Sequence, residues 1–305
     1  MKVLIADAID TAAIERIKQA GLEVTVATGL SPEALLETIP NFEVLVVRSN
    51  PKVTKKVIDA AERLKLIVRA GVGLDNIDVD AAYARNIVVS NTPGATAISV
   101  AEHVMGLMLA LLRHIPAAHA KTDQGVWDKK SFMGGELFEK TLGVVGLGKI
   151  GREVAKRAKA FGMKIMGSDP IVDPETAAEL HIRLVPFEEI LAKSDVMTLH
   201  VPFLPETKNM LHQGNIGLMK KGAYLIFCAR GGIADETAVA NAVKSGHLAG
   251  AAFDVFETEP LPEASPLRNV PGIILTPHLG ASTHEGQRRA GLELADIVLR
   301  FSNQK

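Results

Sequence analysis

The feature that most constrains the fold of this chain is a glycine-rich stretch near its middle, which runs from residue 141 to residue 152. Apolar residues 142–145 predict a short buried strand, and Gly146, Gly148 and Gly151 precede a helical pattern. The first glycine permits a tight turn, the second lets a pyrophosphate approach the backbone, and the third allows the helix to pack closely on the strand. The stretch therefore predicts a dinucleotide site, although an ordinary strand–turn–helix junction would also fit it.

An acidic residue follows at the spacing that a dinucleotide site requires. The helix after the glycines ends at Gly162, and the next apolar run, 163–166, leads to Asp169. This is about 20 residues beyond the glycines, where such folds bind the hydroxyls of the adenine ribose. The carboxylate would repel a ribose 2′-phosphate, and no arginine adjoins it in the sequence, so we expect NAD and not NADP. The alternative is that Asp169 only begins a turn before Pro170.

Short apolar runs alternate with amphipathic helical patterns on both sides of the glycines. We expect strands at residues 3–6, 24–27, 44–47, 66–70 and 87–90, and again at 142–145, 163–166, 196–199, 224–227, 249–253 and 273–275. This alternation predicts an α/β fold whose parallel sheets carry helices on both faces. The 305 residues are enough for two domains. The breaker cluster 91–95 predicts the boundary, with a first domain of residues 1–95 completed by the last helix in 285–305, and a second domain of residues 96–284.

Composition excludes several classes of function. The formal net charge is -1 with both signs interspersed, so we expect no nucleic-acid or membrane partner. Cys228 is the single cysteine, which excludes an internal disulfide and fits a reducing, cytoplasmic location. His284 with Glu285 lacks the spacing of a metal-binding motif, so we expect no metal. The irregular stretch 123–135 carries the only tryptophan, Trp127, and could pack either on a second subunit or within the same chain.

Polar side chains follow the expected strands of the second half. Arg230, Asp254 and His278 each come shortly after an apolar run, and Glu259 lies a few residues beyond Asp254. Ligands of open parallel sheets bind beyond the carboxyl ends of the strands, so these side chains should converge beside the nicotinamide. An arginine can bind a carboxylate bidentately, and a histidine paired with a glutamate can take a hydroxyl proton. The set predicts oxidation of a secondary alcohol next to a carboxylate, although each residue alone could be structural.

These motifs together resemble the D-isomer-specific 2-hydroxyacid dehydrogenases. The resemblance rests on residues 146–151, 228–232, 254–260 and 277–282 and covers essentially the whole chain. It implies a Rossmann NAD-binding domain, a flavodoxin-like substrate domain, and catalytic roles for Arg230, Glu259 and His278. It also implies that NAD contacts Val72, Thr96, Gly146, Gly148, Lys149, Ile150, Gly151, Asp169, His200, Val201, Cys228, Ala229, Arg230, Asp254, His278, Gly280 and Ala281.

Other stretches, at residues 47–49, 68–78, 91–93 and 127–134, resemble the members of this family that oxidise phosphoglycerate. The resemblance implies that a substrate phosphate meets fixed cations, and that backbone amides bind the substrate carboxylate near Arg230 and His278. The candidate cations are Arg48, Arg69 and Lys130, whose alternative role is as surface charges, and the candidate amides belong to Gly71, Val72 and Gly73. Val72 and Thr96 replace the threonine and asparagine often found there. The substrate is therefore less well specified than the reaction class.

The resemblance leads us to expect an NAD-dependent enzyme of serine biosynthesis that oxidises D-3-phosphoglycerate to 3-phosphohydroxypyruvate, with His278 as acid and base. The alternatives are a glyoxylate or hydroxypyruvate reductase, another D-2-hydroxyacid dehydrogenase, or a non-catalytic NAD(H)-sensing protein like the corepressors of this fold. The partners expected are a small-molecule substrate and a second copy in a homodimer. The sequence ends at Lys305, before the regulatory domain of longer members, so we expect no feedback inhibition by serine.

Overall fold

The structure, a computed structural model, describes residues 1–303 and divides into two compact units. The first unit contains residues 1–99 and continues from residue 281, and the second contains residues 100–280. The sequence analysis placed these crossings after residues 95 and 284. The first comes later because Ser99 also belongs to the first unit, where its hydroxyl lies 2.7 Å from Thr283 Oγ1. Residues 304 and 305, which the prediction assigned to the first domain, lie outside the described residues.

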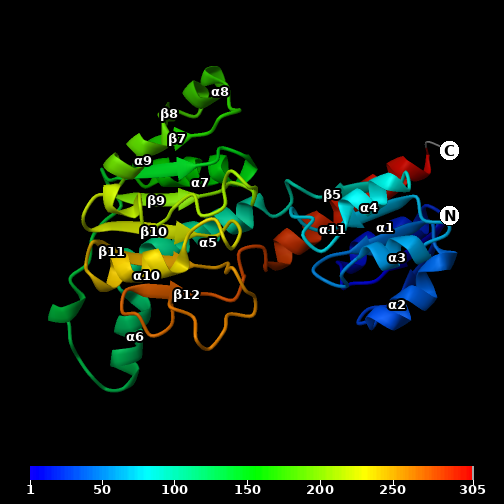
Figure 1. The fold of residues 1–305 in the computed structure, drawn as a ribbon, viewed down its shortest axis with the longest axis horizontal. Coiled ribbons are helices and arrows are strands. Elements are labelled where there is room, and N and C mark those ends of the chain that lie inside the picture. Colours follow the sequence, from blue (N-terminus) through cyan, green and yellow to red (C-terminus); the bar gives the residue numbers. More distant parts are fainter. Residues whose placement is uncertain (304–305) are drawn as a thin grey trace. The chain divides into compact units, whose positions relative to one another are not determined.

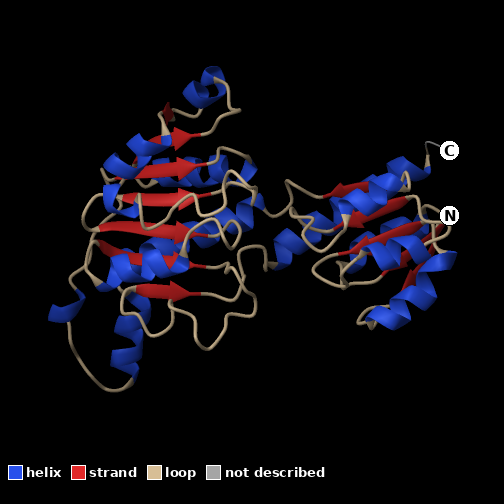
Figure 2. Ribbon diagram, in the orientation of Figure 1, coloured by secondary structure: helices blue, strands red, loops and turns tan. Residues whose placement is uncertain are grey.

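The first unit is built on a five-stranded parallel sheet in the order β2–β1–β3–β4–β5 (Figure 1, Figure 2). Its strands are β1 (Lys2–Ile5), β2 (Glu23–Val26), β3 (Val44–Val47), β4 (Leu66–Arg69) and β5 (Val88–Asn91). This is the flavodoxin-like order. Central β3 is buried along its whole length, as its continuous apolar run predicts.

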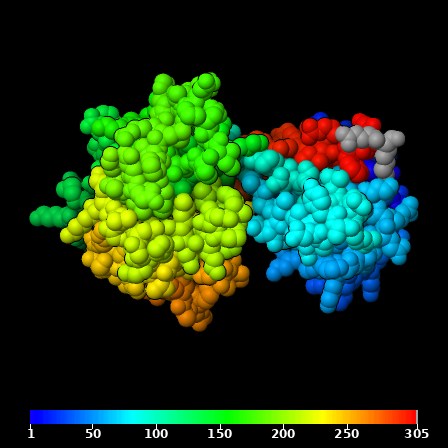
Figure 3. Space-filling model, turned by 45° about the horizontal axis from the view of Figure 1, so that its top comes forward, coloured from blue at the N-terminus to red at the C-terminus, as the bar shows by residue number. Residues whose placement is uncertain are grey.

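Helices cover both faces of this sheet. They are α1 (Thr11–Gln19), α2 (Pro32–Thr38), η1 (Ile39–Asn41), α3 (Lys55–Ala60), α4 (Val79–Ala84) and α11 (His284–Ser302). Ser31 caps α2 by accepting a hydrogen bond from Ala34 N at 3.1 Å, as the Ser-Pro pair predicts. From the end of the chain, α11 inserts Leu294 and Val298 into the core around β1 and α1. Figure 3 shows this segment, in red, beside the blue and cyan residues of the same unit.

The second unit is built on a seven-stranded parallel sheet in the order β8–β7–β6–β9–β10–β11–β12. Its strands are β6 (Thr141–Val145), β7 (Lys164–Ser168), β8 (Arg183–Leu184), β9 (Val196–Leu199), β10 (Ala223–Phe227), β11 (Leu248–Phe253) and β12 (Ile273–Leu275). The order extends that of the Rossmann fold by one strand. The two parallel sheets confirm the predicted fold class. The strand order reverses between β6 and β9, which creates a crevice for ligands at their carboxyl ends.

The helices of the second unit are α5 (Ala97–Leu112, which begins in the first unit), α6 (Ile115–Asp123), η2 (Lys130–Phe132), α7 (Lys149–Ala160), α8 (Pro174–Glu179), α9 (Phe187–Lys193), η3 (Ile216–Leu218) and α10 (Glu236–Lys244). The sequence analysis did not predict α6, α8, α9 or the two-residue β8. In α6 every residue is at least partly exposed, so it lacks the apolar stripe by which a helix is recognised.

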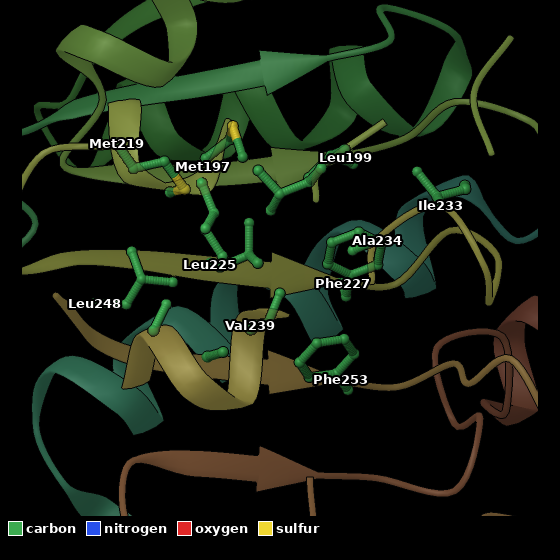
Figure 4. Close-up of a cluster of buried hydrophobic side chains, with 14 of the residues drawn as sticks. Met197, Leu199, Met219, Leu225, Phe227, Ile233, Ala234, Val239, Leu248 and Phe253 are labelled. Carbon is green, nitrogen blue, oxygen red and sulfur yellow. The ribbon is translucent and has the colours of Figure 1, made fainter. Parts of the chain in front are cut away.

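The core of the second unit lies under the strand ends that carry the polar residues. Figure 4 shows Leu199, Phe227 and Phe253 from three neighbouring strands in this core, with Val239 of α10 against them. The rings of Phe227 and Phe253 stack with their centroids 5.3 Å apart. Because the last residues of β9, β10 and β11 are fixed in this way, the loops that follow begin from rigid positions.

Residues 113–135, here called the arm, leave the second unit and return to the same point. The amide of Gly135 donates to the carbonyl of Leu112 at 2.9 Å, so the two ends of the arm meet. Figure 1 shows α6 and the following loop extending away from the sheet. Trp127 and Met133 in this arm are 88% and 84% exposed. Among residues 1–303 no single helix is long and apolar enough to span a bilayer, and α5 with α6 reaches that length only across a 62° bend.

Candidate active site

The glycine loop lies at the point where the strand order of the second sheet reverses. A Cβ atom on Gly146 would lie 2.7 Å from the backbone of His200, and one on Gly151 would lie 2.1 Å from the carbonyl of Gly146. Gly148 differs, because a Cβ there would meet no described atom within 4 Å. It caps α7, whose first residues are Lys149 and Ile150. Close packing at the outer glycines and open space at the middle one fit a pyrophosphate held at the helix N-terminus.

Asp169, directly after β7, is bonded to the glycine loop. Its carboxylate accepts hydrogen bonds from Leu147 N at 2.7 Å, Ile171 N at 2.8 Å and Val172 N at 3.1 Å. Burial opposes ionisation, but these bonds and the Arg152 charge outweigh it and lower the pKa of Asp169. The residue therefore begins a turn and also presents an ionised acceptor. No arginine adjoins Asp169 in the sequence, but α7 carries Arg152 back to the loop, where its Nε donates to the Leu147 carbonyl at 2.7 Å.

Neighbouring strands carry the predicted catalytic side chains to one edge of the second sheet. Arg230 follows β10 and His278 follows β12, on either side of β11 (Figure 1). His278 Nδ1 lies 2.8 Å from Glu259 Oε2, and Glu259 Oε1 accepts a hydrogen bond from Phe256 N at 3.1 Å. The two side chains are 49% and 37% exposed. The loop after β11 therefore holds Glu259 so that it orients the imidazole ring.

Arg230 belongs to a backbone segment that touches this same loop. A Cβ on the next residue, Gly231, would lie 1.8 Å from the carbonyl oxygen of Phe256 and 2.6 Å from Glu257 N. Only glycine permits that approach. The guanidinium of Arg230 donates to the Ala229 carbonyl at 2.7 Å. The segments that carry Arg230 and Glu259 are thus in direct contact, and Glu259 in turn contacts His278.

Asp254 binds the backbone on the far side of His278. It is 1% exposed and accepts hydrogen bonds from Thr276 Oγ1 at 2.6 Å, Leu279 N at 2.7 Å and Gly280 N at 2.8 Å. His103 Nε2 of α5 lies 3.2 Å from the same carboxylate. Burial opposes ionisation, but the four donors outweigh it and lower the pKa of Asp254. The carboxylate therefore remains charged inside the unit.

Cys228 lies beside this carboxylate. Burial and the Asp254 charge raise the pKa of the Cys228 thiol, which makes it a poor nucleophile. The thiol sulfur, a ring nitrogen of His103 and a carboxylate oxygen of Asp254 lie within 4.8 Å of one another. Such atoms can hold a transition-metal ion, which the sequence analysis did not expect. The Asp254 oxygens, however, already accept hydrogen bonds from the backbone and from Thr276.

His200 follows β9 and contacts the glycine loop through its backbone. Its Nε2 lies 3.0 Å from Thr198 Oγ1, whereas Nδ1 is buried without a hydrogen-bond partner among the described residues. Burial lowers the pKa of His200 to about 4. The ring is therefore neutral at physiological pH. The adjacent Val201 places a methyl group 3.0 Å from where a Cβ on Gly146 would lie, so both residues lie against the glycine loop.

The predicted phosphate and carboxylate residues of the first unit lie beyond β3 and β4. Arg69 uses its guanidinium to hold backbone, because Nε donates to the Arg48 carbonyl at 2.8 Å and Nη1 donates to the Gly73 carbonyl. The Gly71 amide donates to Thr92 Oγ1 at 2.8 Å. Arg69 thus fixes the two loops that carry Arg48 and Gly73. This intramolecular role was not foreseen from the sequence.

The remaining predicted residues are in four places. Val72 lies in the loop after β4, where its carbonyl accepts a hydrogen bond from the Asn91 side chain, and Thr96 is 5% exposed just before α5. Ala281 is the residue at which the chain re-enters the first unit. Lys130 is exposed on η2 of the arm.

A family profile decides the classification of this site. The D-isomer specific 2-hydroxyacid dehydrogenase, NAD binding domain, matches residues 105–280. The chain belongs to the D-isomer-specific 2-hydroxyacid dehydrogenase family. The match includes the glycine loop, Arg230, Glu259 and His278, so the second unit contains the NAD-binding domain of a dehydrogenase of this family.

Individual members of the family resemble the chain over most of its length. It is 51% identical over 299 residues to D-3-phosphoglycerate dehydrogenase of Methanocaldococcus jannaschii. The matched residues are 98% of this chain and 57% of that protein. The chain thus spans about half the length of the curated relatives it matches. The TT0316 protein of Thermus thermophilus is 34% identical with a TM-score of 0.91, covering 100% of this chain and 98% of that one. D-lactate dehydrogenase from Aquifex aeolicus, complexed with NAD and lactic acid, is 29% identical with a TM-score of 0.85, covering 99% and 96%.

Sequence reasoning missed the residues that support the site from a distance along the chain. His103 and Thr276 contact Asp254, Arg152 contacts the glycine loop, and Gly231 contacts the Glu259 loop. A glycine next to a candidate arginine was the one visible signal, because paired glycines after a strand often mark a close backbone approach. The others are ordinary residues in helices or strand ends, and no local pattern distinguishes them.

Proposed function

We propose that the chain oxidises D-3-phosphoglycerate to 3-phosphohydroxypyruvate with NAD as the hydride acceptor, a step of serine biosynthesis. The observation that carries the proposal is the 2.8 Å pair of His278 and Glu259 beside the segment of Arg230, at the edge that also bears the glycine loop. The substrate is inferred from relatives named for that reaction at 46–51% identity.

In this proposal the His278–Glu259 pair handles the proton. Glu259 holds Nδ1, so Nε2 is the ring nitrogen that takes the proton of the substrate hydroxyl. The carboxylate stabilises the resulting imidazolium and keeps the ring in one orientation. NAD, when bound along Gly146–Gly151 with its adenine ribose at Asp169, supplies the carbon that accepts the hydride. In the reverse direction the imidazolium returns the proton to the carbonyl oxygen.

The substrate-binding residues in this proposal are those that the family resemblance implies. Arg230 binds the substrate carboxylate bidentately, which orients the reacting carbon. The amides of Val72 and Gly73 assist there, on a loop that Arg69 fixes. Arg48 and Lys130 bind the phosphate. Since two donors of the Arg69 guanidinium already contact backbone carbonyls, its part in phosphate binding is to hold the loop of Arg48.

The test is to measure NADH formation with 3-phosphoglycerate, glycerate and lactate. We expect 3-phosphoglycerate to have the highest kcat/KM, and His278→Asn to lower kcat by about 10²–10⁴-fold with every substrate. Arg48→Ala should raise KM for 3-phosphoglycerate far more than KM for glycerate, whereas Arg63→Ala, an exposed arginine of the same unit, should change neither. A wild-type preference for glycerate or lactate would replace the proposed substrate with an unphosphorylated D-2-hydroxyacid and leave the reaction class intact.

We also propose a homodimer in the cytoplasm. The arm exposes Trp127 and Met133 while its ends are fixed at Leu112, which suits packing on a second copy. A single buried thiol suits a reducing compartment. Sedimentation should give twice the chain mass for the wild type and a smaller mass for Trp127→Glu. Ile171→Glu, which changes an equally exposed residue outside the arm, is the matched control.

A further inference from the structure

His103, on the buried helix α5, takes no part in the mechanism proposed above. Its side chain is 22% exposed, and its Nε2 lies 3.2 Å from Asp254 Oδ1 and 3.2 Å from Thr276 Oγ1. Most of the inward residues of α5 are apolar, including Val104 and Met108, which are fully buried. A polar ring on such a helix needs a partner, and here the partner is a buried carboxylate.

The Asp254 carboxylate contacts two other segments of the chain, α5 and the turn at residues 276–280. Besides His103 of α5, it accepts hydrogen bonds from Thr276 after β12 and from the amides of Leu279 and Gly280. It lies at the end of β11, where its own amide donates to the Phe227 carbonyl at 2.8 Å. This carboxylate therefore holds both ends of the turn at residues 276–280.

That turn holds His278 in an unfavourable backbone conformation. His278 has φ +56°, a left-handed value that few residues with a Cβ adopt. The amides immediately after it, of Leu279 and Gly280, are the two that Asp254 binds. These two bonds, with the bond from His278 N to the Thr276 carbonyl at 3.0 Å, hold the turn from which the imidazole reaches Glu259.

We propose that His103 is a positioning residue for His278 and acts through Asp254. By donating from Nε2, His103 keeps the carboxylate charged and fixed in the orientation that binds the two amides after His278. The proposal rests on the function proposed above, in which His278 exchanges the proton. His103 itself touches neither the Glu259 side chain nor the reacting atoms in this role.

The test compares two substitutions of His103 with a histidine elsewhere. His103→Leu removes the donor and preserves the bulk, whereas His103→Gln can place an amide donor near the same carboxylate oxygen. His181→Asn is the control, because His181 is exposed and its left-handed backbone tolerates asparagine. The first measurement is kcat and KM for wild type and variants. The second is the NMR signal of the His278 ring in protein labelled at histidine Cε1, assigned by its absence from His278→Asn.

We expect His103→Leu to lower kcat by about tenfold with KM changed by less than about twofold, because the proton-transfer geometry is lost and substrate contacts remain. The His278 signal should shift or split in the same variant. His103→Gln should restore most of kcat and the native signal, and His181→Asn should alter neither.

Two results would overturn the proposal. One is an unchanged His278 signal in His103→Leu, whatever happens to activity or thermal stability, because His103 would then only fill space. The other is equal loss of kcat in the leucine and glutamine variants with the signal perturbed in both, because the donor would then not matter. If the wild type oxidises no 2-hydroxyacid at all, the proposed function fails, and the NMR comparison still decides whether His103 positions His278.

Discussion

Gly231→Ala tests the contact that places Arg230 and Glu259 side by side. A Cβ at residue 231 would lie 1.8 Å from the Phe256 carbonyl oxygen and 2.1 Å from the carbonyl carbon. Since real Cβ atoms do not approach backbone within 3.0 Å, one of the two segments must move by ~1.2 Å. Overpacking of this kind costs about 1–3 kcal/mol of folding free energy. Gly231 is outside the positive-φ residues, so the cost comes from the collision alone.

The displacement reaches the catalytic pair through the backbone. Phe256 N donates to Glu259 Oε1, so a shifted Phe256 carries Glu259 away from His278. A misplacement of about 1 Å costs on the order of 10²-fold in rate, and we expect kcat to fall by that factor. Each kcal/mol lost should lower the Tm by about 2–4 °C for a unit of this size.

The assay is NADH formation together with thermal unfolding, with Gly217→Ala as the matched control. A Cβ on Gly217 would meet no described atom within 4 Å, and this glycine also has an ordinary φ. The control should keep kcat and Tm, or gain slightly in stability because the unfolded chain loses freedom. Wild-type kcat and Tm in Gly231→Ala would refute the reasoning, because the two loops could not then be in the contact described.

Four further outcomes follow from the site. Gly151→Ala would place a Cβ 2.1 Å from the Gly146 carbonyl oxygen, so it should weaken NADH binding by at least about tenfold in a fluorescence titration. Wild-type affinity in this variant would argue against pyrophosphate binding at the glycine loop. Asp169→Ser should raise the kcat/KM ratio of NADP to NAD by about tenfold or more, since Arg152 is then unopposed; an unchanged ratio would remove the charge argument. Glu259→Gln should lower kcat by about 10²-fold with little change in KM, and a purely KM effect would contradict its role beside the imidazole. Burial opposes ionisation of Asp195, but the bonds from Lys220 and Thr141 N outweigh it and lower the pKa of Asp195 in the folded state. The ionised side chain therefore stabilises the fold above about pH 4, the usual pKa of an unfolded aspartate, and this stabilisation is lost as pH falls through the lower folded-state pKa. Asp195→Asn should therefore lower the urea midpoint at pH 7 more than at pH 3, and an equal loss at both would contradict this.

Local chemistry was enough to determine most elements of this protein. Short, largely apolar runs between turn residues predicted β3, β9 and β12 with the residue bounds observed, because such runs are typical of strands in a parallel sheet. The helical pattern of residues 97–112 also matches α5 in its bounds. The missed α6 has no buried face, so its sequence carries no periodic signal.

The candidate site likewise has residues that the sequence revealed and contacts that only the fold makes. Its chemically active residues were visible in the sequence, because parallel strands deliver whatever follows them to one edge of a sheet. Their support was decided only by tertiary structure: Asp254 bonded to the turn of His278, Gly231 against Phe256, and Arg152 returning to the glycine loop. Such contacts join segments tens of residues apart, and they depend on distances that no local pattern encodes. The sequence by itself determined which groups are present and at which edge, and the fold decided which atoms hold them in place.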